Sequence, residues 1–219
     1  MAFDGITIAA MVSELNKNLS GGRINKIAQP ESDELLITGK GANGQKRLLL
    51  SASASLPLIY FTGKNRISPL TAPNFCMLLR KHIGSARITA IRQPGLERVV
   101  EFELEHLNEL GDVCHKVLIM ELMGKHSNII FCDDNNMILD SIKHVSCNVS
   151  SVREVLPGRP RTSLFHPPHS GQAGSSYHFQ RRFHGESLRQ IQCRLQSSLS
   201  DAYRFQPGNG SGTLLSRFH

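Results

Sequence analysis

Residues 86–105 read ARITAIRQPGLERVVEFELE and contain two stretches in which apolar side chains recur mainly at every second position. This alternation is typical of β-strands with one buried face. Between the two stretches lies Gln93-Pro94-Gly95. Proline cannot donate a ladder hydrogen bond and glycine can adopt a positive φ, so this tripeptide marks a chain reversal. The sequence therefore predicts a β-hairpin, with Glu97 and Arg98 at the entrance of its second strand.

The residues before the hairpin predict two helices and a group of short strands. Residues 1–19 carry apolar side chains at helical spacing behind Asp4, which is a preferred cap residue, and they end before a Gly-Gly pair. Four short alternating segments follow and predict antiparallel strands: 23–29, 34–38, 46–50 and 58–61. Residues 73–83 begin with a proline and end at a glycine, which predicts a second helix.

The residues after the hairpin predict three more strands, over 114–122, 127–131 and 137–144. Strands and helices do not alternate as in a parallel sheet. The predicted fold class is α+β, an antiparallel β-sandwich or open barrel with flanking helices. No nucleophile with its base, carboxylate pair, phosphate-binding loop or metal-ligand cluster stands out, so we expect no enzyme, no cofactor and no metal.

The formal net charge of +7 is distributed unevenly over the 219 residues. Residues 1–160 hold 18 Lys and Arg against 16 Asp and Glu, whereas residues 161–219 hold 7 Arg against 2 acids. Any affinity of residues 1–160 for phosphate must therefore come from a local patch. No apolar run is long enough for a membrane span and no charged-then-apolar leader opens the chain, so we expect a cytoplasmic protein with no membrane partner. The five cysteines show no CxxC spacing and are expected to be reduced thiols, mostly in the core.

The character of the chain changes from about Arg161, where Lys, Val and Met disappear and apolar periodicity ends. We expect one domain over residues 1–160, followed by a disordered basic tail over residues 161–219. An RNA-binding arm is a functional alternative for this tail. A third interpretation, which we prefer, is that the tail is read out of frame. A shift of one base can restore the continuation that is usual in related proteins.

Six ordered blocks resemble a known family: MAFDGI at Met1, GGRINKIAQP at Gly21, FCMLLRKHI at Phe75, QPGLER at Gln93, ELMGKHSNII at Glu121 and DSIKHV at Asp140. They resemble the NFACT-N domain of the RqcH/NEMF family, whose bacterial members are often labelled fibronectin-binding proteins. The resemblance covers residues 1–160. It implies a fold similar to the N-terminal domain of the Fpg/Nei DNA glycosylases and a role in ribosome-associated quality control.

The resemblance also implies partners and site residues. Members of the family bind an obstructed large ribosomal subunit that carries peptidyl-tRNA, and they recruit tRNA to add an untemplated C-terminal tail, which is alanine in bacteria. Their functional residues fall on Asp4, Glu97 and Arg98, although Glu97 stands where the family has aspartate. Lys125 stands where the family usually has arginine, which loses a bidentate phosphate fork.

The basic residues of the chain agree with a role in RNA binding, because basic side chains hold RNA backbones. Arg80, Lys81 and Arg92 are expected to join Arg98 in a phosphate-facing patch. An alternative function is a surface adhesin that binds fibronectin, which would need export and anchoring signals. Glycosylase chemistry is disfavoured because Ala2 stands where an N-terminal proline nucleophile would be required.

Overall fold

The computed structural model describes residues 4–64, 66–150 and 153–161. All of them lie in the first of two compact units, Met1–Gly171. The second unit, Gln172–His219, and all of the predicted tail except its first residue, Arg161, lie outside the described residues.

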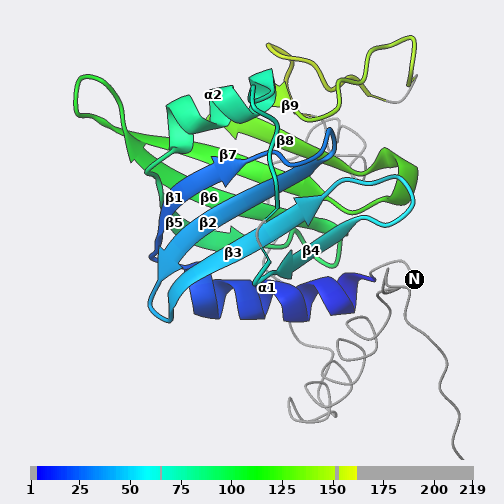
Figure 1. Ribbon diagram of the computed structural model, residues 1–219. Helices are drawn as coiled ribbons and strands as arrows, with labels where there is room; N and C mark the ends of the chain where they lie inside the picture. The colour runs from blue at the N-terminus through cyan, green and yellow to red at the C-terminus, as the bar shows by residue number, and fades with distance from the viewer. Residues whose placement is uncertain (1–3, 65, 151–152, 162–219) are drawn as a thin grey trace, which may run out of the picture. The chain divides into compact units, whose positions relative to one another are not determined.

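The described residues form one nine-stranded sheet and two α-helices (Figure 1). The elements follow the chain as α1 Gly5–Leu19, β1 Arg23–Ala28, β2 Glu34–Gly41, β3 Gly44–Ser51, β4 Leu58–Phe61, α2 Asn74–Ile83, β5 Arg87–Arg92, β6 Val99–Leu107, β7 Val113–Glu121, the 3₁₀-helix η1 Gly124–His126, β8 Asn128–Asp133 and β9 Ile138–Ser141. Neighbouring strands are all antiparallel, in the order β4-β3-β2-β1-β5-β6-β7-β8-β9. This confirms the predicted α+β class. The sheet is open, with β4 and β9 at its edges.

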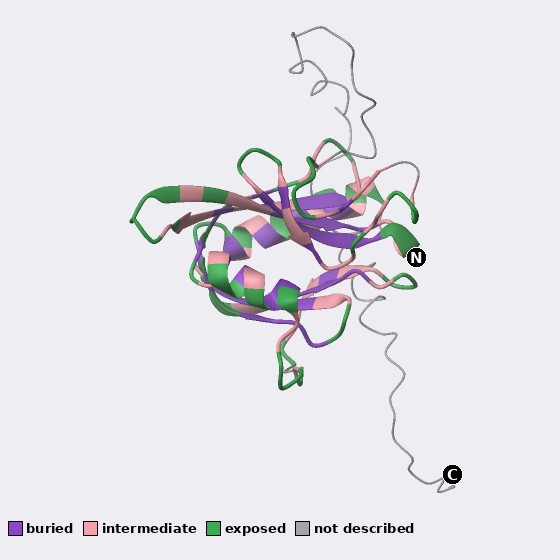
Figure 2. Cartoon of the chain, turned by 90° about the horizontal axis from the view of Figure 1, so that it is seen from above, coloured by how far each residue is buried: buried purple, intermediate pink, exposed green. Residues whose placement is uncertain are grey.

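Alternation along the strands divides their side chains between two faces. On β6, Val100, Phe102 and Leu104 join the main core, whereas Val99 belongs to a second cluster on the opposite face. Both helices bury their apolar residues in the main core. We call the sheet face that carries the helices the inner face and the opposite one the outer face. Figure 1 shows α1 along the bottom and α2 at the top, and Figure 2 shows buried residues on the sides of helices and strands that face each other.

The predicted hairpin is confirmed. Strands β5 and β6 pair antiparallel, with a register shift between Ile88 and Ala90. Gly95 in the connecting turn has φ +55°, a conformation that costs an L side chain free energy, so the glycine suits the turn. The hairpin meets the first half of the sheet at a narrow junction, because β1 and β5 share a single register pair, Arg23 with Arg87.

Helix α1 reinforces this junction through a side chain. Asn16 donates from Nδ2 to the Ile91 carbonyl at 2.5 Å and accepts from the Ile91 amide at 3.0 Å. The Asn16 amide thus pairs with the β5 backbone as a neighbouring strand would. Its two hydrogen bonds fix the position of α1 along β5.

The segment after β9 packs on the outer face, although no strand or helix was predicted there. Val155 is buried and forms an isolated bridge with Val145. The guanidinium of Arg153 forms a buried bidentate ion pair with Glu121 of β7, in which Nη1 donates to Oε1 at 2.9 Å and Nη2 contacts Oε2. Arg161 pairs with Glu101 at 2.6 Å. These contacts make residues 153–161 a strap across β6 and β7.

The described cysteines are all free. Cys76 and Cys132 are buried, and burial raises the pKa of the Cys132 thiol to about 11, so it stays protonated at neutral pH. Cys114 is half-buried and Cys147 is exposed. The expectation of core thiols therefore fits Cys76 and Cys132 but not Cys147. Cys193 lies outside the described residues.

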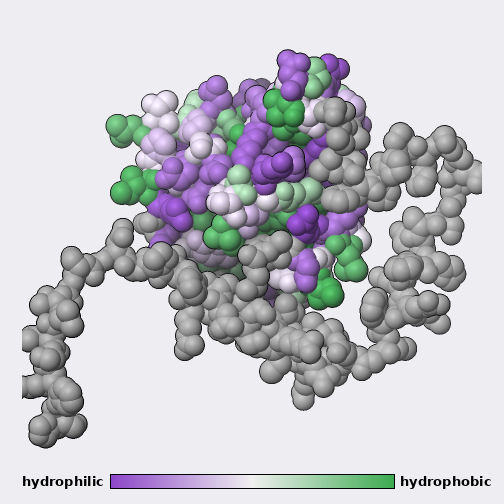
Figure 3. Space-filling model, turned by 90° about the vertical axis from the view of Figure 1, so that its right-hand side faces the viewer, coloured by the Kyte–Doolittle hydropathy of each residue, from purple (hydrophilic) through white to green (hydrophobic). Residues whose placement is uncertain are grey.

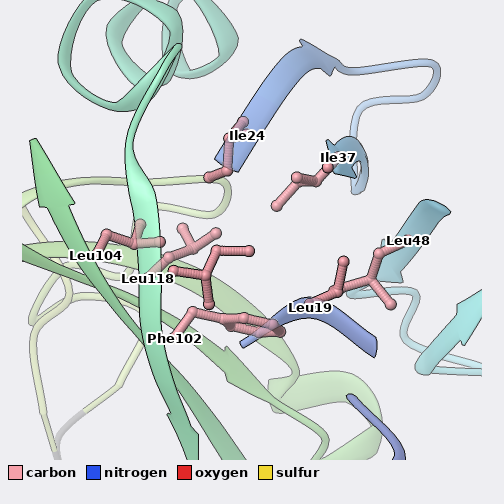
Figure 4. Close-up of a pocket in the computed structure, with 9 residues that line it drawn as sticks. Leu19, Ile24, Ile37, Leu48, Phe102, Leu104 and Leu118 are labelled. Carbon is pink, nitrogen blue, oxygen red and sulfur yellow. The ribbon is translucent and has the colours of Figure 1, made fainter. Parts of the chain in front are cut away.

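A small void of about 10 Å³ lies inside the main core (Figure 4). It is lined by Leu19, Ile24, Ile37, Gly39, Leu48, Ile88, Phe102, Leu104 and Leu118. These residues offer no polar side-chain atom to a ligand. The void is a packing gap below β2, where Gly39 leaves space that a side chain would occupy.

Gly39→Ala is expected to stabilise the protein. An added Cβ would lie 3.4 Å from the Arg23 carbonyl oxygen and 3.5 Å from Leu19 Cδ2, which are ordinary contacts, and the φ of Gly39 is not positive. Alanine also reduces the conformational freedom of the unfolded chain, so we expect a gain of about 0.5–1 kcal/mol. The free energy of unfolding from urea titration tests this, and an unchanged or lower value would contradict it.

Candidate nucleic-acid interface

The turn between β5 and β6 lies directly against the first residues of α1. A Cβ added to Gly5 would stand only 2.0 Å from the Leu96 carbonyl oxygen, so the two backbones are in contact there. Gln93 Nε2 donates to the Gly5 carbonyl at 2.9 Å and to the Glu97 carbonyl at 2.8 Å. The amide of Gln93 therefore joins the start of the helix to the far side of the turn. We call this contact the helix–turn junction.

Asp4 caps helix α1, as predicted. Its Oδ1 accepts a hydrogen bond from the Thr7 amide at 2.7 Å. Hydrogen bonding from Thr7 is the main reason why the pKa of Asp4 lies below its usual value. The carboxylate is exposed and stays ionised at neutral pH. Asp4 thus presents a negative charge beside the helix–turn junction.

Asp4→Ala is expected to lower the free energy of unfolding by about 1 kcal/mol at neutral pH, because the Thr7 amide loses its acceptor. Asp4→Asn keeps the cap and removes the charge, so it should change stability by less. The folded-state pKa of Asp4 is depressed, so the charge-dependent part of its contribution is present above the unfolded pKa and is lost as pH falls through the folded value. Urea titrations at neutral and acidic pH test this, and equal losses for both variants would contradict it.

Glu97 and Arg98 lie between the turn and the first residue of β6, and both side chains are half-buried. The Glu97 amide donates to the Pro94 carbonyl at 3.1 Å, which closes the turn. The Arg98 carbonyl accepts from the Leu122 amide at 2.8 Å, so Arg98 stands opposite the end of β7. None of the ion pairs among the described residues includes Arg98.

Lys125 follows Leu122 by three residues and lies exposed in η1. Backbone contacts thus gather four of the predicted site residues at one end of the sheet. Asp4 comes from the start of α1, Glu97 and Arg98 from the turn, and Lys125 from the connection between β7 and β8. We call this set the turn cluster. Figure 3 views the molecule from the side on which α1 begins, and there the visible described surface is mainly hydrophilic with separate apolar spots.

The other three predicted site residues are held differently. Arg92 is the last residue of β5 and pairs with Glu103 at 3.0 Å. Arg80 is exposed, and its Nε donates to the Ile27 carbonyl at 2.8 Å, so the guanidinium lies beside the end of β1. Lys81 is exposed on α2. Because α2 lies at the top of Figure 1 and α1 at the bottom, Arg80 and Lys81 are on a different part of the surface from the turn cluster.

The buried ion pair between Glu121 and Arg153 was not predicted from the sequence. Glu121 and Arg153 are both almost fully buried. Only the position of Glu121 on the outer face of β7, where apolar residues would be expected to pack, could have drawn attention to it.

Among the described residues, no group of three or more His, Cys, Asp or Glu could hold a metal ion. Within the same ranges, neither helix is long and apolar enough to cross a membrane.

The sequence profile of the family described as "NFACT N-terminal and middle domains" matches residues 4–203. "Rqc2 homolog RqcH" of Bacillus subtilis (strain 168) is 44% identical over 162 residues, which cover 73% of this chain and 28% of that protein. "Ribosome quality control complex subunit NEMF" of Homo sapiens is 28% identical over 141 residues, which cover 64% of this chain and 12% of that protein. The chain thus spans about three tenths of the length of its bacterial relatives.

Two solved structures are similar in fold. The N-terminal part of the fibronectin/fibrinogen-binding protein from Streptococcus suis has a TM-score of 0.71 and 38% identity, and the match covers 77% of this chain and 62% of that one. The N-terminal domain of fibronectin-binding protein PavA from Streptococcus pneumoniae has a TM-score of 0.72 and 33% identity, covering 94% of this chain and 74% of that one.

Proposed function

Because the chain belongs to the family of NFACT N-terminal and middle domains, we propose that it is the tRNA-binding and large-subunit-binding module of a ribosome quality control factor. The relatives named as ribosome quality control proteins support this role. The partners are the large ribosomal subunit with peptidyl-tRNA and free tRNA, and the place of action is the cytoplasm. The full activity, C-terminal alanine tailing of stalled peptides, belongs to a longer protein of which this chain spans a part.

The observation that carries the proposal is the helix–turn junction. Gln93 holds the Gly5 and Glu97 carbonyls 2.9 and 2.8 Å from one amide group. It therefore keeps the capping carboxylate of Asp4 near Glu97 and Arg98. A pair of exposed residues at an ordinary turn has no such support, and fixed geometry is what recognition of a defined RNA feature requires.

The chemistry of the turn cluster suits binding without catalysis. The planar guanidinium of Arg98 can donate two parallel hydrogen bonds to a phosphate, or stack on an unpaired base. Glu97 and Asp4 can accept hydrogen bonds from base edges or ribose hydroxyls, which phosphate-binding cations cannot do. Lys125 adds a point charge for a further phosphate. Such a mixture of acids and bases favours a specific contact over general attraction to RNA.

Arg98→Ala is expected to weaken tRNA binding by roughly 1–3 kcal/mol with little change in melting temperature. The reason is that Arg98 makes none of the described ion pairs, so its loss removes few contacts from the fold. Glu97→Asp keeps the charge and should retain tRNA affinity, whereas Glu97→Ala should lose it. Fluorescence anisotropy with labelled tRNA and differential scanning calorimetry measure the two quantities.

A matched control is Arg159→Ala, which removes one arginine from an exposed pair with Glu154. This variant should bind tRNA as the wild type does. If Arg98→Ala and Arg159→Ala lose the same affinity, the effect is one of net charge and the turn cluster has no special role. If the double variant Glu97→Ala with Arg98→Ala binds tRNA normally, the proposal is overturned.

The alternative of a fibronectin-binding adhesin is tested with the same proteins. Both similar solved structures carry fibronectin binding in their names, so immobilised fibronectin is the natural competitor probe. Binding of fibronectin that Arg98→Ala leaves intact, together with absent tRNA and large-subunit binding, would favour the adhesin. The out-of-frame origin of residues 161–219 is a separate prediction, which resequencing of codons 155–165 tests.

A further inference from the structure

On the outer face of the sheet, cations without an acidic partner among the described residues gather on one half, whereas acids and bases balance on the other. On β1, β2 and β3 the small cluster of Ala28, Leu36 and Leu49 marks this face, because it is separate from the main core. Side chains two residues away along a strand share a face. By this rule and by the strand register, Lys26, Thr38 and Arg47 form one row across the outer face, and Arg23 and Lys40 belong to the next.

The cations of these rows are accessible. Arg23, Lys26 and Lys40 are exposed and enter none of the described ion pairs. Arg47 is half-buried, and its Nη1 donates to the Gly63 carbonyl at 3.0 Å. Thr38 between Lys26 and Arg47 is only 6% exposed, as expected when long basic side chains cover a strand with their stems. We call Arg23, Lys26, Lys40 and Arg47 the basic face.

The carboxylates of the outer face lie on the other half of the sheet. Glu101, Glu103 and Glu105 alternate with the inward-facing residues of β6, and Glu121 has the same place on β7. Arg161, Arg92 and Arg153 pair with Glu101, Glu103 and Glu121, and Arg87 stands opposite Glu105 in the strand register. On β1, β2 and β3, the one carboxylate on the outer face is Glu34. It stands at the end of β2 away from Lys40 and pairs with Arg66 at 3.0 Å.

From this segregation of charge we propose that the basic face is a second RNA-binding surface, which contacts phosphates of an RNA backbone without reading sequence. Lys26 and Arg47 stand two strands apart, which is about 10 Å on a sheet. This spacing is too wide for a single phosphate but suits successive phosphates along a backbone. The choice of RNA as the ligand rests on the proposed function. The residues of the basic face lie outside the turn cluster.

An RNA backbone fits this surface better than a lipid surface does. Binding to a membrane interface needs apolar side chains that enter the acyl boundary besides cations. None of the exposed large apolar side chains lies on β1, β2 or β3 in the described chain. Phosphate contacts to RNA need only accessible cations. The affinity that they provide falls as the salt concentration rises.

The test uses the full chain and an RNA duplex of arbitrary sequence, titrated at several salt concentrations. Lys26→Gln with Lys40→Gln should weaken duplex binding about tenfold and reduce the slope of log affinity against log salt by about two. Lys26→Arg with Lys40→Arg keeps the charges and should retain both values. The control is Lys17→Gln with Lys116→Gln, which removes the same charge from α1 and from an inward-facing position of β7.

Each result decides the proposal. Residues 162–219 are common to all variants, so their contribution cancels in the comparison. Equal losses of duplex affinity in the Lys26/Lys40 glutamine variant and the control variant would overturn the proposal. A wild type that binds no duplex would also overturn it, as would one that binds anionic vesicles through these lysines in place of RNA. Arg98→Ala should leave duplex affinity largely intact. If tRNA binding proves independent of Arg98 while the lysine effect holds, the turn-cluster role fails and the basic face stands.

Discussion

Replacement of Glu121 by leucine is expected to lower the free energy of unfolding by about 3–5 kcal/mol, enough to unfold a marginally stable domain. The carboxylate and the Arg153 guanidinium are 4% and 8% exposed. Removal of the carboxylate takes the oppositely charged partner away from a guanidinium that is almost fully buried. The free energy of unfolding from urea titration, or the melting temperature if the variant is too unstable, measures the effect.

Two controls separate burial from simple loss of an ion pair. Glu121→Leu with Arg153→Leu removes both charges, so it should be considerably more stable than Glu121→Leu alone. Arg159→Leu removes an arginine from its 3.1 Å pair with Glu154, whose side chains are 60% and 29% exposed, and should cost about 0–1 kcal/mol. A loss in Glu121→Leu no larger than in Arg159→Leu would show that the strap is not held by the buried pair.

Gly5→Ala is expected to cost about 3 kcal/mol of stability and to reduce tRNA binding as well. The new Cβ would stand 2.0 Å from the Leu96 carbonyl oxygen and 2.9 Å from its carbonyl carbon, and backbone atoms cannot give way as a side chain can. Overpacking of this kind usually costs 1–3 kcal/mol, and the closeness of the contact places Gly5→Ala at about the upper end. The clash must move α1 away from the turn, which separates Asp4 from Arg98.

The matched control is Gly63→Ala. At Gly63 a Cβ meets no atom within 4 Å, and φ is not positive. This variant should keep both its stability and its tRNA affinity. Paired measurement of melting temperature and tRNA anisotropy tests the link between junction and binding. A Gly5→Ala protein that melts early but binds tRNA normally below its melting temperature would show that the turn cluster does not depend on the helix–turn junction.

Local patterns predicted most of the fold. The alternation in residues 86–105, the Asp4 cap and the Pro73 helix start are properties of a few neighbouring residues, and the structure confirms each of them. Strand ends were less well predicted, because β2 and β6 continue through residues such as Lys40 and His106 whose side chains need no burial. Pairing with a neighbouring strand, which sequence periodicity does not reveal, decides where such strands stop.

The contacts that assemble the site could not be predicted from periodicity. The strap depends on Arg153 and Glu121, which are 32 residues apart, and an arginine in a loop ordinarily suggests solvent exposure. The same limit applies to Arg80, whose bond to the Ile27 carbonyl spans 53 residues. A helical pattern could not show which backbone group Arg80 would meet. The roles of Asp4, Glu97 and Arg98 in RNA binding came from family resemblance alone and stay predictions.

The reach of Gln93 has a consequence for the order in which this domain matures during its own synthesis. Its bond to the Gly5 carbonyl joins residues 88 positions apart, and Asn16 meets Ile91 at a separation of 75. Helix α1 is therefore made first but cannot complete its docking until the hairpin has left the ribosomal exit tunnel. The meander β1–β4 depends on short-range pairings, which form before long-range ones. The part of the amino-terminal helix that packs on β5 and β6 thus stays uncovered for most of the time that translation of the domain takes.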